Sequence, residues 1–546
     1  MSIKLIFYRT LFSQSAASLT MGSLAAFLNQ KGIDCELVLL EREGLHNAEK
    51  ILEGGGDKVN IVIAKPNFKD YSLMFPVLAE MKKQMNIDRV FFCGPYASLN
   101  CDTLMADLKW LDGIIVSNIE ETSADLVKSF RGNIFDAKCP GGVWRNCRTK
   151  KTSRYFPRTN NVRLDNLPFP NRDIEKEEAG SYVNIEASRG CYGQCNFCHI
   201  PLMSRLVGTK NLIDNRQPKL VVAEMQELYE KLGKTLFIFN DSCFWRNEKD
   251  NERILEFCSE LKKRKMPIKF YIYLKCYPSL PDNVLKELAA VGLIRVFLGI
   301  ENVSSNSQKV FNKKIDMSSY ETIKERFDCY NVNIHIGYMV FEPYSAPDDI
   351  IKNLAYLRKV DKLWRLGVIL EQVRVVPGTA FHKQLIQDGL IDSNLKYDKL
   401  TYGYKFQSPE TELIFKMIRK IFLVDLGVKS YEYEYYCTTT GLLRDLCGQS
   451  DKKIYARLEG DFAEFQKMKE DSMDCIYRFL RKLVRLVRED VCETTEGKAT
   501  IKKFLDEFDG HYLALKIKHA YIFCVLKEAG RKDLTDSIYR GLDRLS

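Results

Sequence analysis

The sequence predicts an α/β protein in three parts: an N-terminal doubly wound, Rossmann-like parallel sheet, a central partial (β/α)6 barrel, and a C-terminal all-helical region. Three observations lead to this fold class. Short apolar runs alternate with helical patterns in the N-terminal quarter of the chain, the alternation resumes after an irregular segment rich in Pro, Asn and Arg, and only helical periodicity follows it. We therefore expect a sheet domain over residues 1–138, a linker over 139–181, a barrel over 182–405 and a helical domain over 406–546.

Length, composition and charge limit the class of protein. At 546 residues and 45% hydrophobic content, the chain is long enough for two or three domains. No stretch approaches the ~20 apolar residues of a membrane span, and the N-terminus lacks a signal-peptide pattern, so we expect a cytoplasmic protein. Its 17 cysteines are then mostly reduced thiols, and a cluster among them indicates a metal site. The net charge of +10 is modest for this length, and nucleic acid is not an expected partner.

Five apolar runs predict the parallel strands of the N-terminal sheet: residues 3–9, 35–41, 59–66, 89–95 and 113–117. Such a sheet binds its ligand in the crevice at the carboxyl ends of the strands. The residues at those ends are small or polar, as a wide polar ligand needs, and are the candidate contacts: Thr10, Ser13, Ser15, Pro66, Asn67, Gly94, Pro95, Ser117 and Glu120. Ordinary turn residues would show the same pattern. The absence of a G-x-G-x-x-G motif disfavours a dinucleotide.

Six further strand–helix units predict the barrel, with strands at residues 181–190, 235–241, 268–275, 294–301, 332–341 and 367–379. Six units fall short of the eight in a closed barrel, so we expect an open one. The chemistry of such a barrel lies on loops at the carboxyl ends of its strands. The first of these loops carries three cysteines at spacings of four and three: Cys191, Cys195 and Cys198.

Three thiolates on one loop indicate an open metal centre. A structural zinc site takes four ligands, and no second C-x-x-C pair follows here; His199 is too close to Cys198 to complete a tetrahedron easily. A cubane iron–sulfur cluster normally takes four thiolates, so three would leave one iron open to another ligand. Gly190 and Gly193 would let the loop wrap around such a cluster.

The pattern C-x-x-x-C-x-F-C resembles the signature of the radical S-adenosylmethionine (SAM) enzymes. The resemblance implies that Cys191, Cys195 and Cys198 hold a [4Fe-4S] cluster whose fourth iron is chelated by SAM, which is cleaved to a 5′-deoxyadenosyl radical. It also implies that Phe197 packs near the adenine. We add His199, next to Cys198, to the SAM-binding candidates.

Three later segments resemble other SAM contacts of the same family. Asn240 and Asp241, in "FNDSCF", match the position that accepts the SAM amino group, and Glu301, in "LGIEN", matches the carboxylate on the ribose. The segment containing Val375 resembles the one that passes the adenine. Each of these is weak alone, and their order after the cysteine loop strengthens them together.

The order of domains, the "LPFPNRD" linker and "GYMVFEPYSAPDDI" resemble the cobalamin-binding radical SAM proteins. The resemblance implies cobalamin on the N-terminal sheet and, most often, methyl transfer to an unactivated carbon through methylcobalamin. The chain departs from this subclass at Ser117–Glu121, "SNIEE", where "GEGE" is frequent, and it has no D-x-H-x-x-G motif to supply a histidine to cobalt.

The expected function is therefore that of a cobalamin-dependent radical SAM methyltransferase. Two alternatives stay open: a radical SAM enzyme with non-methylating chemistry and cobalamin lost or repurposed, and a noncatalytic metal-binding protein. The resemblance also implies a small-molecule or peptide substrate and a flavodoxin- or ferredoxin-type reductant. The sequence identifies neither the substrate nor a residue that acts on it.

Overall fold

The structure is a computed structural model, and it describes residues 2–8, 16–40, 59–66, 71–84, 87–130, 139–146, 149–155, 158, 162–177, 182–206, 213–276, 279–313, 318–396 and 401–531. The chain divides into two compact units, and each is described by itself. The first unit comprises residues 1–299, 311–336 and 374–403, and the second comprises residues 300–310, 337–373 and 404–546.

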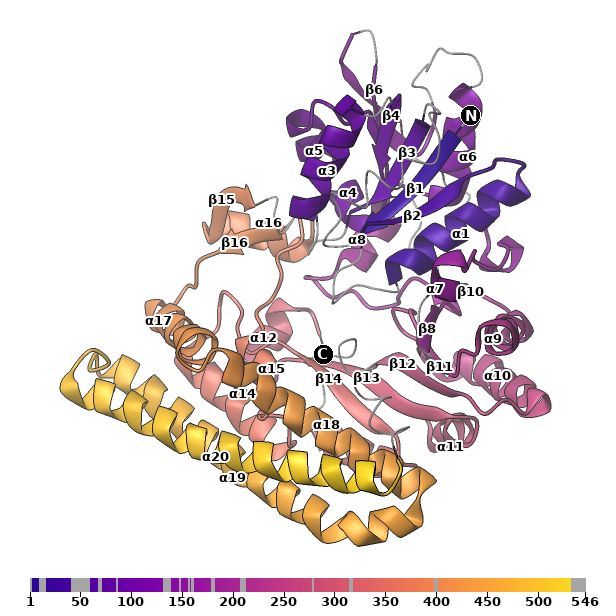
Figure 1. Cartoon of the computed structure of the whole chain (residues 1–546). Coiled ribbons are helices and arrows are strands. Elements are labelled where there is room, and N and C mark those ends of the chain that lie inside the picture. Colours follow the sequence, from indigo (N-terminus) through magenta and orange to yellow (C-terminus); the bar gives the residue numbers. More distant parts are fainter. Residues whose placement is uncertain are drawn as a thin grey trace. The chain divides into compact units, whose positions relative to one another are not determined.

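The N-terminal sheet has seven strands in the order β2-β1-β3-β4-β5-β6-β7 (Figure 1). Its five parallel strands, which the sequence predicts, are β1 (Ser2–Tyr8), β2 (Glu36–Leu40), β3 (Val59–Lys65), β4 (Arg89–Phe92) and β5 (Gly113–Ile115). The sequence did not predict β6 (Gly142–Arg145) and β7 (Thr152–Tyr155), which extend the sheet antiparallel from within the expected linker.

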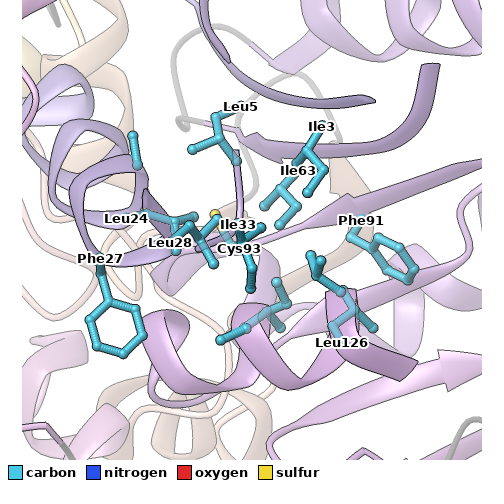
Figure 2. Close-up of a cluster of buried hydrophobic side chains, with 14 of the residues drawn as sticks. Ile3, Leu5, Leu24, Phe27, Leu28, Ile33, Ile63, Phe91, Cys93 and Leu126 are labelled. Atoms are coloured by element: carbon cyan, nitrogen blue, oxygen red, sulfur yellow. The ribbon is translucent and has the colours of Figure 1, made fainter. Parts of the chain in front are cut away.

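Helices cover both faces of this sheet because successive strand residues point to opposite sides. Ile61 and Ile63 pack with α1 (Ala16–Gln30) and α6 (Ile119–Ser129), and Figure 2 shows this core around Cys93. The alternate residues of the same strand pack with α3 (Tyr71–Gln84), α4 (Pro95–Leu99) and α5 (Cys101–Asp107). Both faces of a parallel sheet are normally buried in this way, which explains the near-continuous apolar runs of its strands.

Trp144 of β6 packs over two glycines of the sheet. Its indole N–H donates a hydrogen bond to the Cys139 carbonyl, 2.6 Å away. Its ring lies over Gly113 and Gly142, where any Cβ atom would collide with it. The two glycines therefore leave the space that this buried side chain fills.

The barrel sheet has five strands in the order β14-β13-β12-β11-β8. They are β8 (Tyr182–Ile185), β11 (Leu236–Phe239), β12 (Lys269–Lys275), β13 (Leu293–Glu301) and β14 (Asn333–Tyr338). The pairs β8–β11, β11–β12 and β12–β13 are parallel. The helices that follow its strands include α9 (Pro218–Leu232), α10 (Asn251–Arg264), α11 (Asp282–Ala290) and α13 (Ser318–Cys329), and β9 (Ser188–Arg189) pairs with β10 (Asp214–Asn215) beside it.

The sixth predicted barrel strand, at residues 367–379, was wrong in its first part. Residues Leu366–Leu370 form the short helix α15, and only an isolated bridge joins Gln372 to Phe341. The side chains of Leu366, Val368 and Ile369 are buried, and the Gly367 N–H donates a hydrogen bond of 3.0 Å to Glu434. Tertiary contacts within the second unit thus outweigh the β-branched composition of this segment.

The C-terminal helices are α17 (Pro409–Arg419), α18 (Val428–Ser450), α19 (Lys452–Arg488) and α20 (Thr495–Glu528), with a π-helical segment at Lys420–Asp425. The side chains of Phe479, Leu483, Leu486 and Val487 on α19 are buried, and Phe479 stacks on Phe504 of α20 at 3.8 Å between ring centroids. The remaining elements are α7 (Asp173–Glu177), α8 (His199–Leu206), α12 (Ser305–Val310), α14 (Pro347–Lys359), α16 (Ala380–Gln387), β15 (Ile391–Lys396) and β16 (Thr401–Tyr404). Among the described residues, no helix combines the length and apolarity that crossing a bilayer requires.

Candidate functional site

The cysteine loop, residues 190–198, joins β9 to α8 in the first unit. Gly190 opens it with φ +94°, a conformation that side chains disfavour. The Cys191 thiol accepts a hydrogen bond of 3.4 Å from the Gly193 N–H, and the Cys198 N–H donates to the Cys195 carbonyl at 3.1 Å. All three cysteines are half-buried. The loop thus holds them on one short, tightly turned segment at the carboxyl end of β8.

Residues far along the chain hold this loop. The Asn196 N–H donates to the Phe311 carbonyl at 3.0 Å, and the Asn196 carbonyl accepts from the Phe381 N–H at 3.1 Å. The Asn312 amide donates to the Gln194 carbonyl at 2.9 Å. These bonds satisfy the loop's backbone without a regular element, and the sequence carried no signal for them.

Phe197 packs edge-on against Phe311, with 5.0 Å between ring centroids. Phe311 in turn contacts the ring of Phe381 at 6.0 Å. The aromatic residue expected near the adenine therefore lies in an aromatic cluster that supports the loop.

Three thiols on one short loop suit an iron–sulfur cluster, which takes thiolate ligands. Within the described part of the chain, no three His, Cys, Asp or Glu side chains are grouped to share one ion. A [4Fe-4S] cluster does not require such a group, because each thiolate binds a different iron. An anionic cluster also favours nearby cations, and the Lys275 ammonium at the end of β12 lies 4.4 Å from the centre of the Tyr192 ring. A Cβ atom on Gly193 would lie 2.6 Å from this ammonium, so the glycine allows the approach.

The two residues expected at the SAM amino group differ in exposure. Asn240 is exposed at the end of β11, and its N–H donates to the Ile185 carbonyl at 2.8 Å. Asp241 is only 1% exposed, and its carboxyl group accepts hydrogen bonds from the Ala187 N–H and the Ser188 hydroxyl. Burial raises the pKa of Asp241 to about 7. Asp241 therefore holds the segment that leads into the cysteine loop, and Asn240 is the more accessible of the two.

The other expected SAM contacts are divided between the units. His199 opens α8, and burial lowers its pKa. Val375 is fully buried in the first unit. Glu301 belongs to the second unit, where it has φ +70° and its carbonyl accepts a hydrogen bond of 2.6 Å from the Met339 N–H. A glutamate in the left-handed region is strained, and such strain concentrates at functional sites.

The described candidates on the N-terminal sheet lie at its carboxyl edge. Thr10, Ser13, Ser15 and Asn67 lie outside the described residues. Pro66, directly after β3, is buried, Gly94, with φ +91°, is the N-cap of α4, and Pro95 is the first residue of that helix. Ser117 follows β5, and its buried hydroxyl has no hydrogen-bond partner among the described residues. The described candidates thus share the edge that the sequence predicts.

Lys65 is a half-buried cation at this edge that sequence reasoning missed. It ends β3, and its ammonium donates a hydrogen bond of 2.7 Å to the Thr20 hydroxyl. Burial lowers its pKa to about 8. Its aliphatic stem lies against Gly94, where an added Cβ atom would be 3.2 Å from Lys65 Cγ. Its place at the end of a predicted strand is the signal that could have found it.

Two side-chain contacts join this edge to the two ends of the cysteine loop. Arg189, just before the loop, donates a hydrogen bond of 2.8 Å to Glu120 in the first turn of α6. His199, just after the loop, packs against Tyr96 of α4 with 6.4 Å between ring centroids. The carboxyl edge of the sheet and the cysteine loop are therefore neighbours in one compact unit.

Residues 185–360 match the Radical SAM superfamily, which confirms the resemblance predicted from the cysteine pattern. The 4′-phospho-dehydrooxetanocin synthase of Priestia megaterium is 22% identical over 219 residues, which cover 37% of this chain and 29% of that protein. The chain thus spans less than a third of this curated relative.

Two solved structures share the fold. The cobalamin-dependent S-adenosylmethionine radical enzyme OxsB, with aqua-cobalamin and S-adenosylmethionine bound, superimposes with a TM-score of 0.69 at 14% identity and covers 100% of this chain and 84% of its own. The radical S-adenosylmethionine methyltransferase TsrM from Kitasatospora setae gives a TM-score of 0.54 at 14% identity. The superposition covers 66% of this chain and 71% of the TsrM chain. The predicted combination of a Rossmann-like sheet, a partial barrel and C-terminal helices is confirmed at the level of the fold.

Proposed function

Because residues 185–360 match the Radical SAM superfamily, we propose that this protein is a cobalamin-dependent radical SAM enzyme that methylates an unactivated carbon. One observation carries the proposal: the carboxyl edge of the N-terminal sheet contacts both ends of the cysteine loop within one unit. A cobalamin bound at the sheet edge and a cluster bound by the loop would then lie close together.

In this proposal the three cysteines hold a [4Fe-4S] cluster through their thiolates. Gly190 and Gly193 let the loop turn, and Lys275 offsets negative charge beside it. When bound, the cluster supplies the electron that cleaves SAM, and cobalamin carries the methyl group.

The residues around SAM divide the work of binding it. Phe197 would contact the adenine, Asn240 and His199 would contribute from either side of the cysteine loop, and Val375 would support the segment that passes the adenine. Glu301 of the second unit would hold the ribose hydroxyls, and its strained backbone supports that assignment. Asp241 acts on the loop rather than on the ligand, because its carboxyl oxygens already accept hydrogen bonds from the chain.

Cobalamin would lie at the carboxyl edge of the N-terminal sheet, where Pro66, Gly94, Pro95 and Ser117 are placed. The positive φ of Gly94 allows a close backbone approach to a large ligand at this edge. The substrate class is a small molecule or a peptide, and the electron donor is a flavodoxin- or ferredoxin-type protein.

The first experiment is anaerobic purification, cluster reconstitution and addition of hydroxocobalamin, followed by measurement of iron, sulfide and cobalt per chain. Four irons and one cobalt support the proposal. The matched control is the Cys191→Ala/Cys195→Ala/Cys198→Ala variant, which should keep cobalt and lose iron. Iron without cobalt would remove cobalamin from the proposal, and a wild type without iron would overturn it.

A second function has its own supporting observation. Non-methylating radical chemistry is the alternative, because the relative 4′-phospho-dehydrooxetanocin synthase is named as a synthase and not as a methyltransferase. Incubation of the reduced enzyme with SAM and candidate substrates separates the two, because methyl transfer from SAM releases S-adenosylhomocysteine. Cleavage that yields 5′-deoxyadenosine without S-adenosylhomocysteine favours the alternative.

A further inference from the structure

We propose that Glu120 and Tyr96, two residues of the N-terminal sheet domain, are positioning residues for the iron–sulfur cluster. The inference rests on the proposed function in one respect, that the three cysteines hold a cluster. It assigns Glu120 a role different from the cobalamin contact that its place at a strand end predicts.

Glu120 is held away from solvent by a specific partner. Its side chain is 4% exposed, and a buried carboxylate is costly unless it is paired and hydrogen-bonded. Arg189 supplies the pair at 2.8 Å, and the position of Glu120 in the first turn of α6 also favours a negative charge. Its carboxylate is therefore committed to the chain.

Arg189 transmits this contact to the first cysteine. Its guanidinium also donates a hydrogen bond of 2.9 Å to Glu186, so two carboxylates fix its place. Only Gly190 separates Arg189 from Cys191, and the φ of +94° at this glycine turns the backbone directly into the loop. A shift of Arg189 would consequently shift Cys191.

Tyr96 acts at the other end of the loop. It is the second residue of α4, and its ring packs against His199. His199 directly follows Cys198 and begins α8. Burial raises the pKa of the Tyr96 hydroxyl, so the side chain is uncharged where it packs against His199. The sheet domain thus braces the loop at both of its ends.

Electrostatics gives the Glu120 contact a distinctive signature. Arg189 is a cation next to an anionic cluster site, and Glu120 neutralises part of its charge. Glu120→Gln keeps an acceptor oxygen of similar shape and removes the negative charge. Because net charge near a cluster sets its reduction potential, the potential should shift to a more positive value.

The experiment uses the reconstituted full-length protein without cobalamin or substrate. It measures iron per chain, the electron paramagnetic resonance (EPR) spectrum of the reduced cluster and its midpoint potential. The matched control is Asp125→Asn, because Asp125 lies on the same helix α6 and pairs with Arg158 rather than with the loop. Glu120→Gln should show a positive potential shift and altered EPR lines, and Asp125→Asn should match the wild type.

Tyr96 is tested by two variants that separate packing from the hydroxyl. Tyr96→Ala should lower the iron per chain and broaden the EPR spectrum, and Tyr96→Phe should restore both.

If Glu120→Gln does not fold, Arg189→Lys replaces it. This variant keeps the positive charge at position 189 but loses the planar guanidinium that reaches Glu120 and Glu186. It should then alter the EPR lines with a smaller potential shift.

The results distinguish this inference from the proposed function. A wild type without iron overturns the proposed function. The role of Glu120 is overturned if the wild type holds a cluster and Glu120→Gln leaves the EPR spectrum and the midpoint potential unchanged. The same result in Arg189→Lys, where that variant replaces Glu120→Gln, also overturns it. Wild-type iron content and spectrum in Tyr96→Ala overturn the role of Tyr96.

Discussion

The carboxyl group of Asp241 accepts a hydrogen bond of 2.5 Å from the Ser188 hydroxyl, and its second oxygen accepts one of 2.9 Å from the Ala187 N–H. Both donors precede the cysteine loop by a few residues. A side chain at the end of one strand thereby fixes the turn after the neighbouring strand. The protonation of this buried group is linked to the stability of the fold.

Asp241→Asn should change how stability depends on pH. Burial raises the folded pKa of Asp241 from 3.8 to about 7, so between these values the folded state binds a proton that the unfolded state has lost. The wild type therefore loses stability as pH rises from 4 to about 7, and the asparagine variant does not. Three pKa units give an upper limit of roughly 4 kcal/mol for the change in relative stability.

Urea unfolding at pH near 5 and near 8, followed by circular dichroism, measures this effect. Asp173→Asn is the control, because Asp173 is exposed and its pKa is lowered by Lys176. The stability of Asp241→Asn relative to the wild type should rise between the two pH values. A relative stability that stays constant would contradict the prediction.

Glu301→Gly should separate stability from ligand binding. A glutamate at φ +70° is strained, and glycine removes that strain, which should raise the free energy of unfolding by about 1 kcal/mol. The same change removes the carboxylate proposed to hold the SAM ribose. Thermal unfolding and equilibrium dialysis with SAM measure the two effects. Asn331→Gly, at φ +55°, is the control and should retain SAM binding; undiminished binding in Glu301→Gly would argue against the ribose assignment.

Lys275→Met should make the cluster harder to reduce. Its ammonium lies over Tyr192 and beside Gly193, and the loss of a positive charge near a cluster lowers its reduction potential. Lys269→Met removes the same charge from the opposite end of β12, where the side chain is exposed. Potentiometric titration of both reconstituted variants should give a more negative midpoint for Lys275→Met alone. Equal midpoints in both variants would show that Lys275 does not influence the cluster.

Two glycine-to-alanine changes should affect stability in opposite directions. A Cβ atom on Gly22 would collide with the Asn171 carbonyl oxygen, so Gly22→Ala should cost roughly 1–3 kcal/mol. Gly460 lies in the middle of α19 with no atom within 4 Å of the added carbon, so Gly460→Ala should stabilise the helix by about 1 kcal/mol. Denaturant unfolding of the full chain measures both. Equal changes in the free energy of unfolding for the two variants would show that the space around Gly22 does not determine the effect of the Gly22→Ala substitution.

Hydrophobic periodicity was enough to predict the five parallel strands of the N-terminal sheet, because each is a continuous apolar run between helices. It could not predict β6 and β7, because each has only four residues within a stretch rich in Pro, Asn and Arg. Arg145 ends β6 with its side chain buried, since it donates to the Leu111 carbonyl at 2.9 Å. A partner so distant in sequence leaves no local pattern.

The candidate site shows the same limit. Spacing identified the cysteine loop, position at a strand end identified Glu120 as a candidate contact on the N-terminal sheet, and the family resemblance identified Asp241 as a candidate SAM contact. The sequence could not show that these carboxylates are already bonded to Arg189 and Ser188. It also missed Tyr96, whose contact with His199 depends on the packing of α4 against α8.

The division of the chain into two interleaved units affects which fragments can form the cysteine loop and when the loop can form during translation. The chain passes between the two units after residues 299, 310, 336, 373 and 403, so the first unit is interrupted twice along the sequence. A fragment of residues 1–299 would contain all three loop cysteines and lack Phe311 and Phe381, whose backbones hold the loop. During translation the loop leaves the ribosome long before its supports, and its final backbone pairing can form only after Phe381 has emerged.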